Sequence, residues 1–194
     1  EQVNAFKPFT GTLPQSDKVI LSYIGTCAGE RNFQSLIKAI DLLYVRYPEF
    51  KDKMEIRLLG NLLECDKDLI ESRKLGHIIK YIGRKTQDEL SKYYRESDVF
   101  IVIDSPQERN VFFPSKLVDY FYYQRPILGI SPRIGVTNEL LTASGNHCFE
   151  NNDIEGIANY LHTAISDFTY LLSSDKKYYQ NFLPDSINTE YKQV

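Results

Sequence analysis

The sequence lacks a disulfide framework, a long apolar run and a strong net charge. Its three cysteines are odd in number and form no CxxC pair, which indicates neither a disulfide scaffold nor a zinc knuckle and favours a reducing cytoplasm. No apolar stretch approaches the roughly 20 residues that a membrane helix requires, and the first residues show no signal-peptide pattern. The net charge of -3 gives no electrostatic reason to expect a nucleic-acid partner.

Several motifs of catalysis and ligand binding are absent too. The chain contains neither the GxGxxG of dinucleotide sites nor the GxxxxGK[ST] of phosphate-binding loops, and no GxSxG turn offers a serine nucleophile. The three histidines, His77, His147 and His162, lie in different predicted elements without an HExxH pair, so a metal cluster is not expected. We therefore predict no metal and no cofactor.

What the sequence does contain is a regular alternation of strand-length apolar runs with segments of helical period. This pattern predicts an α/β fold, a Rossmann-like parallel sheet of about six strands with helices on both faces. The predicted strands are Val19–Gly25, Met54–Gly60, Ile78–Gly83, Asp98–Asp104, Pro126–Ser131 and Asn146–Glu150.

Helical periodicity fills the intervals between these strands. An apolar stripe runs from Phe33 to Tyr47 and stops at Pro48, and further helices begin after Asp, Thr, Ser or Pro start signals. The further predicted helices are Asp66–Leu75, Gln87–Glu96, Pro114–Tyr123, Thr137–Ala143, Ile154–Ser166, Lys176–Phe182 and Ser186–Val194. The many tyrosines, Tyr94 among them, are expected to cover half-buried helix faces, and a stacking platform for a base or sugar is the second interpretation.

The polar residues 1–17 have no clear periodicity and resemble a linker, whereas residues 18–194 form the predicted domain with its C-terminal helices. We expect that the linker arrives from an N-terminal domain that this chain does not contain.

Ligands of an open parallel sheet bind at the carboxyl ends of its strands, so the loops there are the candidate sites. The loop after the first strand reads GTCAGERN, in which Gly25 and Gly29 allow close approach of a ligand and Arg31 can hold a diphosphate. We place Arg31 at the start of the following helix. Taken alone, this loop favours an ordinary turn and a solvated arginine.

The loop and helix that follow the fourth strand carry a stronger signal. Pro114 and Ser115 begin the predicted helix, whose free backbone donors attract phosphate. Lys116 and Asp119 share one helix face, so the lysine can neutralise phosphate charge while the aspartate accepts ribose hydroxyls. The alternative is an exposed ion pair worth a few tenths of a kcal/mol.

Two stretches of the chain, YIGTCAGERNFQSLIKAIDLL and PSKLVDYFYYQRPILGIS, resemble one known family. The N-terminal stretch resembles the first strand, basic loop and long helix of the C-terminal, nucleotide-sugar-binding domain of GT-B glycosyltransferases of family 4, or group 1. The other stretch is similar to that family's subgroup pattern P-x-K-x-x-E-Y followed by a strand. The resemblance covers Lys18 to Val194. It implies that Asp119 grips the donor ribose and that Lys116 lies near the diphosphate.

Two departures from the family pattern concern the donor contacts. Val111 occupies the position of a glutamate that usually contacts the donor sugar, and Thr26 that of an arginine. Glu108, Arg109 or Asn110 can substitute from the same loop, and the sequence does not choose among them. We predict sugar contacts from Asn110 and Val111.

By this resemblance, the chain is expected to bind a nucleotide diphosphate sugar for retaining, metal-independent transfer to a sugar or lipid-linked acceptor, in surface-polysaccharide biosynthesis. Arg31 and Lys116 are the predicted catalytic residues, and the predicted nucleotide-binding residues are Gly25, Thr26, Arg84, Ser115 and Asp119. The domain is expected to be inactive alone and cytoplasmic, with any membrane proximity arising from the missing N-terminal domain.

Three other interpretations fit parts of the sequence. An epimerase of GT-B-like fold shares the donor-binding residues, and a flavodoxin-like binding module would leave the loop charges solvated. The sequence Asp66-Lys67-Asp68 matches the DxD motif of metal-dependent glycosyltransferases. However, it begins a predicted helix, where acidic residues are favoured because they interact with the positive end of the helix dipole.

Overall fold

The computed structural model describes residues 17–171. Most of the predicted linker, up to residue 16, and the predicted helices Lys176–Phe182 and Ser186–Val194 lie outside the described residues.

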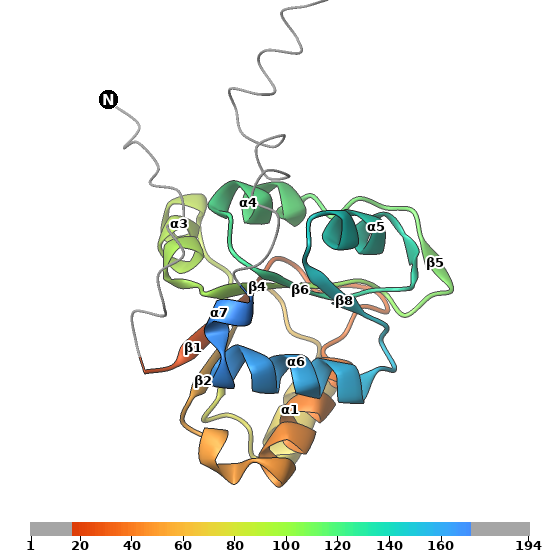
Figure 1. Cartoon of the computed structure of the whole chain (residues 1–194). Coiled ribbons are helices and arrows are strands. Elements are labelled where there is room, and N and C mark those ends of the chain that lie inside the picture. Colours follow the sequence, from red (N-terminus) through yellow and green to blue (C-terminus); the bar gives the residue numbers. More distant parts are fainter. Residues whose placement is uncertain (1–16, 172–194) are drawn as a thin grey trace, which may run out of the picture.

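A six-stranded sheet forms the centre of the described domain (Figure 1). Every pairing between its neighbouring strands is parallel, which confirms the predicted fold class. In spatial order the strands are β3 (Ile79–Gly83), β2 (Met54–Leu59), β1 (Val19–Ile24), β4 (Val99–Ile103), β6 (Ile127–Ile130) and β8 (His147–Phe149). All six are the strands that the sequence predicts, within about one residue at each end.

Helices cover both faces of this sheet, as expected from the alternating pattern (Figure 1). One face packs against α1 (Gln34–Arg46), α2 (Glu64–Ser72), α6 (Ile154–Ser166) and α7 (Phe168–Leu171). The other face packs against α3 (Gln87–Glu96), α4 (Lys116–Tyr123) and α5 (Val136–Ala143). A short 3-10 turn, η1 (Pro48–Phe50), follows α1 where Pro48 ends the helix.

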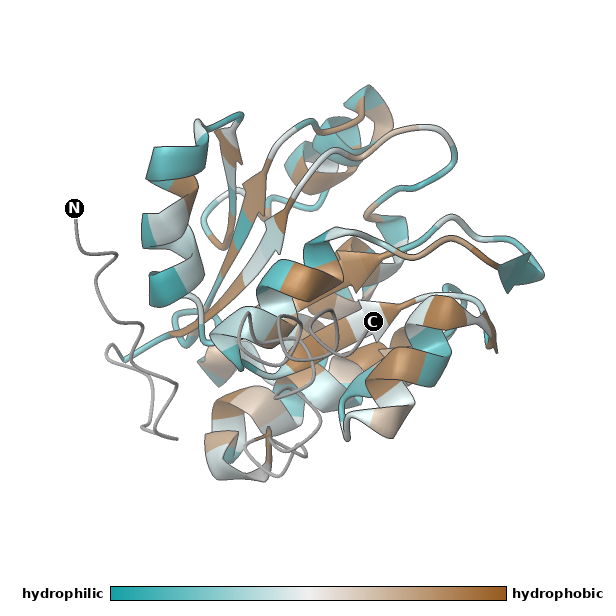
Figure 2. Cartoon of the chain, turned by 90° about the horizontal axis from the view of Figure 1, so that it is seen from above, coloured by the Kyte–Doolittle hydropathy of each residue, from teal (hydrophilic) through white to brown (hydrophobic). Residues whose placement is uncertain are grey.

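The two cores arise because successive side chains of a strand point to opposite faces. In β4, Ile101 and Ile103 pack with α1 and α6, whereas Phe100 and Val102 pack with α3 and α4. Both faces of this central strand are therefore apolar, and the strands in Figure 2 are predominantly coloured as hydrophobic. A strand buried on both faces reads in sequence as a continuous apolar run, which is why it is predicted well.

Differences from the predicted elements are confined to short segments and helix ends; α2, for example, spans Glu64–Ser72 and not the predicted Asp66–Leu75. The sequence did not predict the pair β5 (Arg109–Asn110) and β7 (Ile134–Gly135), because two-residue strands carry no periodicity. Their close approach requires the glycine at 135, where an added Cβ would lie 2.2 Å from the Asn110 carbonyl oxygen. The short helix α7 was not predicted either.

The sheet opens between β1 and β4. Six residue pairs are in register between β1 and β2, but only two between β1 and β4, at Leu21 and Ser22. Beyond them the Tyr120 hydroxyl of α4 replaces the ladder: it accepts the Ile24 N-H at 3.0 Å and donates to the Ile101 carbonyl at 3.0 Å. The strand order also reverses between β1 and β4, and such a switch point forms a ligand crevice in open α/β sheets.

Candidate functional site

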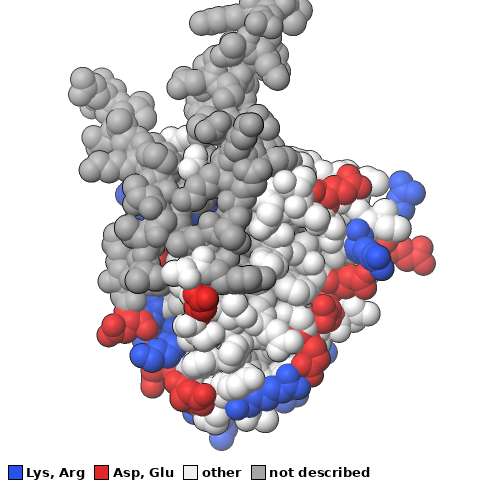
Figure 3. All heavy atoms as spheres, in the orientation of Figure 1, with Lys and Arg blue, Asp and Glu red and all other residues white. Residues whose placement is uncertain are grey.

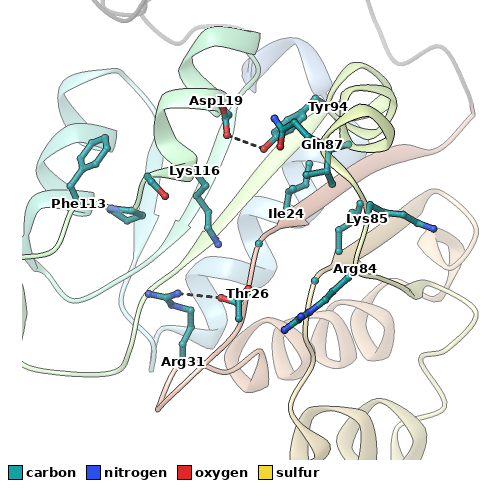
Figure 4. Close-up of a pocket in the computed structure, with 16 residues that line it drawn as sticks. Ile24, Thr26, Arg31, Arg84, Lys85, Gln87, Tyr94, Phe113, Lys116 and Asp119 are labelled. Atoms are coloured by element: carbon teal, nitrogen blue, oxygen red, sulfur yellow. Dashed lines mark hydrogen bonds between the residues drawn. The ribbon is translucent and has the colours of Figure 1, made fainter.

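A pocket of about 790 Å³ lies at this switch point, at the carboxyl ends of β1 and β2 and beside α3 and α4 (Figure 4). It brings together seven of the residues that the sequence singled out. These are Gly25, Thr26, Arg31, Arg84, Ser115, Lys116 and Asp119. Their convergence follows from the rule that parallel strands deliver their loops to one edge of the sheet.

Side-chain hydrogen bonds fix the loop that carries Arg31. The Tyr23 hydroxyl donates to the Thr26 carbonyl at 3.1 Å, and the Cys27 thiol donates to the Arg31 carbonyl at 2.8 Å. Burial raises the pKa of this thiol to about 11, so it remains a donor at neutral pH. The predicted position of Arg31 at a helix start is wrong, because α1 begins three residues later at Gln34.

Asp66 explains where that helix begins. It lies on α2 with its carboxylate buried, and its Oδ1 accepts the Phe33 N-H at 3.0 Å, directly before α1. A helix start needs acceptors for its free N-H groups, and here a neighbouring helix supplies one. Burial raises the pKa of this carboxyl group.

Arg31 faces the pocket from the loop (Figure 4). Its Nη1 donates to the Thr26 carbonyl at 3.4 Å, and its Nη2 lies 3.9 Å from Oδ1 of the buried Asp104. Its Nε is buried and has no hydrogen-bond partner among the described residues. The guanidinium is thus held in place by long contacts that leave donors available to a ligand.

Lys116 reaches the same region from the first turn of α4. Its Nζ is buried, makes no hydrogen bond within residues 17–171, and lies 3.7 Å from the centroid of the Tyr23 ring. Burial, and to a smaller extent the positive charge of Arg31, lower the pKa of Lys116, and the charge of Asp104 partly opposes them; the resulting pKa is about 7. The exposed ion pair with Asp119, the alternative that the sequence leaves open, is therefore not what this lysine forms.

Asp119 lies one turn later on the pocket side of α4. Its Oδ2 accepts a hydrogen bond from the Tyr94 hydroxyl at 3.1 Å (Figure 4). The aspartate itself is exposed at the pocket mouth. Tyr94 therefore orients this carboxylate in addition to covering a helix face. Burial strongly raises the pKa of the Tyr94 hydroxyl, so the hydroxyl stays protonated and donates the hydrogen bond.

Two glycines form the floor of the pocket. Gly25 has φ +143° and Gly60 has φ +118°, conformations that other residues rarely adopt. A Cβ on Gly25 would lie 2.9 Å from the Lys116 Nζ, and one on Gly60 would lie 2.0 Å from the Gly25 carbonyl oxygen. A side chain at position 25 would therefore displace the end of the lysine from its buried position, at a backbone conformation that such a residue rarely adopts.

Asn110 and Val111 are not among the residues that line this pocket. The Asn110 Oδ1 accepts the Phe112 N-H at 2.9 Å, which commits the side chain to its own turn, and Val111 is 58% exposed. Glu108 lines a separate pocket of about 480 Å³ together with Arg133. Sugar contacts from Asn110 and Val111 remain predictions that the pocket geometry does not test.

Sequence reasoning missed several residues of the site. Asp104 and Gln87 were not candidates, and Tyr94 was considered only as a helix-face cover or a stacking platform, although Asp104 ends the fourth predicted strand, at the edge where ligands bind. A carboxylate at the end of a buried strand was the available signal. Tyr94 and Gln87 belong to α3, whose contact with the site depends on tertiary packing that no local pattern reports.

The described residues contain no group of three or more His, Cys, Asp or Glu side chains arranged to hold a metal ion. His162 packs on the Tyr47 ring, with centroids 4.3 Å apart.

Within residues 17–171, no helix is both long and apolar enough to cross a membrane. On the face shown in Figure 3, basic and acidic side chains are intermixed along the edge of the described region.

Comparison with known proteins identifies a family to which this sequence is similar. The sequence profile of the family described as "Glycosyl transferases group 1" matches residues 7–181. A search of curated proteins found no match.

Solved structures match the fold. The C-terminal domain of a glycosyl transferase group 1 family protein (LpcC) from Francisella tularensis is 18% identical, with a TM-score of 0.58, over 89% of this chain and 86% of that one. A glycosyltransferase from Rickettsia africae is 17% identical, with a TM-score of 0.70, over 92% of this chain and 47% of its own. Anabaena Alr3699/HepE, in complex with UDP and glucose, is 15% identical, with a TM-score of 0.67, over 91% and 48%. The chain thus spans about half the length of these last two proteins and matches one Rossmann-like half of a GT-B fold.

Proposed function

The chain belongs to the glycosyl transferases of group 1, and we propose that its described domain binds the nucleotide diphosphate sugar donor of a sugar-transfer reaction. The observation that carries the proposal is the buried Lys116 Nζ, which has no hydrogen-bond partner among the described residues and lies in the same pocket as Arg31. A buried cation without a partner is costly. A diphosphate supplies the missing acceptors.

The proposed chemical role of these cations concerns the leaving group. When the bond between sugar and diphosphate breaks, negative charge develops on the diphosphate, and cations already in place lower the barrier. Lys116 and Arg31 approach the pocket from opposite sides, and the N-terminus of α4 adds a partial positive charge. In this proposal both residues act without moving far.

The nucleoside is proposed to lie toward α3. Asp119, oriented by Tyr94, accepts the ribose hydroxyls, while Gly25, Thr26 and Ser115 allow the backbone to approach the phosphates. Arg84 forms the opposite wall, where its Nε donates to the Asn61 side chain at 2.8 Å.

Further parts of the proposal rest on the family resemblance. They are retention of anomeric configuration, transfer without a metal, and a hexose as the transferred group. Two of the matched proteins were solved with such ligands, HepE with UDP and glucose and the pneumococcal O-GlcNAc transferase GtfA with UDP and GlcNAc. The acceptor, a sugar or a lipid-linked sugar of surface-polysaccharide assembly, is proposed to bind a domain preceding the linker of residues 1–17.

Nucleotide titration tests the proposal. A thermal-shift panel of UDP, GDP, ADP and their hexose conjugates identifies the ligand, because binding to the native state raises its apparent stability. Isothermal titration with that ligand then compares Lys116→Ala and Asp119→Ala with Lys38→Ala, which removes an exposed lysine on α1. We expect each pocket variant to bind about 10-fold or more weakly, since a hydrogen bond to a charged group contributes about 1.5–3 kcal/mol. The Lys38 variant should bind like the wild type.

Two results would contradict the proposal: no stabilisation by any nucleotide, or unchanged affinity in both pocket variants. A separate assay addresses the domain arrangement. The isolated domain should bind donor yet transfer no sugar, because catalysis is proposed to need the acceptor domain closed over the donor. Rapid transfer by the isolated domain would show that no second domain is needed.

A further inference from the structure

The environment of Lys116 contains an imbalance of charge. Its side chain is enclosed by the Tyr23 ring of β1, by the loop carrying Cys27 and Arg31, and by the end of β4 at Asp104. Two cations thus share one enclosed region with one carboxylate. No anion is placed to serve the lysine alone.

The single carboxylate faces other groups: one of its oxygens is hydrogen-bonded, and the other, which has no hydrogen-bond partner among the described residues, faces Arg31. Asp104 is 1% exposed; its Oδ2 accepts the Ser131 hydroxyl at 2.9 Å, and its Oδ1 lies 3.9 Å from the Arg31 guanidinium. The other nearby carboxylate, Asp119, accepts the Tyr94 hydroxyl at the pocket mouth. The face of the Tyr23 ring attracts an ammonium group, but it offers no hydrogen-bond acceptor oxygen.

Resting on the proposed function, we infer that binding of the donor diphosphate is coupled to the uptake of one proton by Lys116. The neutral amine is the form suited to the empty pocket, and the ammonium ion is the form that holds the donor. The proton comes from solvent when the donor binds and returns to solvent when the nucleotide leaves.

The charges around Lys116 determine how donor affinity changes with pH and over which pH range. Burial, and then the charge of Arg31, lower the pKa of Lys116 to about 7, so about half of the empty sites carry the proton at pH 7. A diphosphate beside Nζ brings negative charge and acceptors, and both favour the ammonium ion. The pKa in the complex is therefore higher than in the empty site, and donor affinity falls as pH rises above 7.

The size of the effect follows from this pKa. At pH 8, about 90% of empty sites are unprotonated, so binding takes up to about 0.9 proton per site. Affinity should fall by up to about 10-fold for each pH unit above 7 until the pKa of the complex is reached. At pH 6 uptake should be about 0.1 proton.

Calorimetry in paired buffers measures the proton directly. The probe is UDP-glucose, or the nucleotide sugar that binds best in the panel, because its diphosphate diester has no titrating group of its own near neutral pH. Binding heats at pH 8 in Tris and in HEPES differ by the number of protons taken up multiplied by the difference in buffer ionisation enthalpy. We expect about 0.5–0.9 proton at pH 8 and about 0.1 at pH 6.

Two variants assign the proton to Lys116. Lys116→Arg keeps a permanent charge, so it should bind with little proton uptake and with nearly constant affinity from pH 6 to 8.5. Lys116→Met keeps most of the side-chain length but not the charge, so this variant should bind the donor weakly at every pH, also without proton uptake. Thermal melting checks that both variants fold, and the wild-type measurement decides the question if either does not.

The possible failures are distinguishable. Tight wild-type binding with under about 0.2 proton at pH 8, or undiminished uptake in the methionine variant, would overturn the coupling and leave donor binding intact. Absence of binding by every nucleotide sugar at pH 6 would overturn the proposed function and the inference with it.

Discussion

Replacing Tyr120 with phenylalanine removes one hydroxyl from the opening of the sheet. That hydroxyl accepts the Ile24 N-H and donates to the Ile101 carbonyl, both at 3.0 Å, and all three residues are at most 3% exposed. The ring stacks on Phe100 with centroids 4.4 Å apart, a contact that the variant retains. The substitution therefore leaves packing intact and leaves a buried donor and acceptor without this partner.

A buried group left without its partner costs about 1–3 kcal/mol, and a carbonyl loses less than an N-H because it has a second lone pair. We expect Tyr120→Phe to lower the free energy of unfolding by about 2–4 kcal/mol, measured by urea denaturation monitored with circular dichroism. Tyr81→Phe is the matched control, since its hydroxyl also bonds a carbonyl, that of Gly60, but the residue is 50% exposed. That variant should lose under about 1 kcal/mol. A Tyr120 variant within about 0.5 kcal/mol of the wild type would refute the bridging role.

Three further predictions concern the pocket and its surroundings. Gly25→Ala should weaken nucleotide-sugar binding at least about 10-fold in isothermal titration, because its Cβ would lie 2.9 Å from the Lys116 Nζ and its φ of +143° is one that alanine rarely adopts. Gly76→Ala, at a glycine outside the pocket with nothing within 4 Å and no positive φ, should bind normally. Asp66→Ala should lower the free energy of unfolding by about 1–2 kcal/mol by removing the acceptor at the start of α1, and a melting temperature equal to that of the wild type would contradict this. Burial raises the pKa of Asp98, so ionisation of its carboxyl group lowers the free energy of unfolding of the wild type as pH rises toward that raised pKa. The free energy of unfolding of Asp98→Asn, relative to that of the wild type, should therefore increase between pH 4 and pH 7. A difference that stays constant or decreases over this range would show the sign to be wrong.

The fold was predictable because its signals are local. Each of the six sheet strands is a short apolar run bounded by turn residues, and a strand such as β4 needs no partner to be identified. The start of α1 was less predictable, since the Asp66 carboxylate that accepts the Phe33 N-H comes from another helix. The pair β5 and β7 exists only through contact between segments distant in the chain.

Some features of the candidate site were also predictable from the sequence, and others were not. Lys116, Asp119 and Arg31 were predicted to lie together because they follow parallel strands, and the pocket contains all three. What the sequence could not indicate is the burial of Lys116, which depends on the Tyr23 ring and on the missing side chain at Gly25. Periodicity along α4 reports only which face is polar.

The most direct test of donor binding is a crystal structure of the domain with the nucleotide diphosphate that binds best. The expected result is a nucleotide with phosphate oxygens within hydrogen-bonding distance of the Lys116 Nζ and the Arg31 guanidinium, and with ribose hydroxyls on the Asp119 carboxylate. A nucleotide bound instead in the other pocket, between Glu108 and Arg133, or one that leaves Lys116 without a phosphate contact, would contradict it.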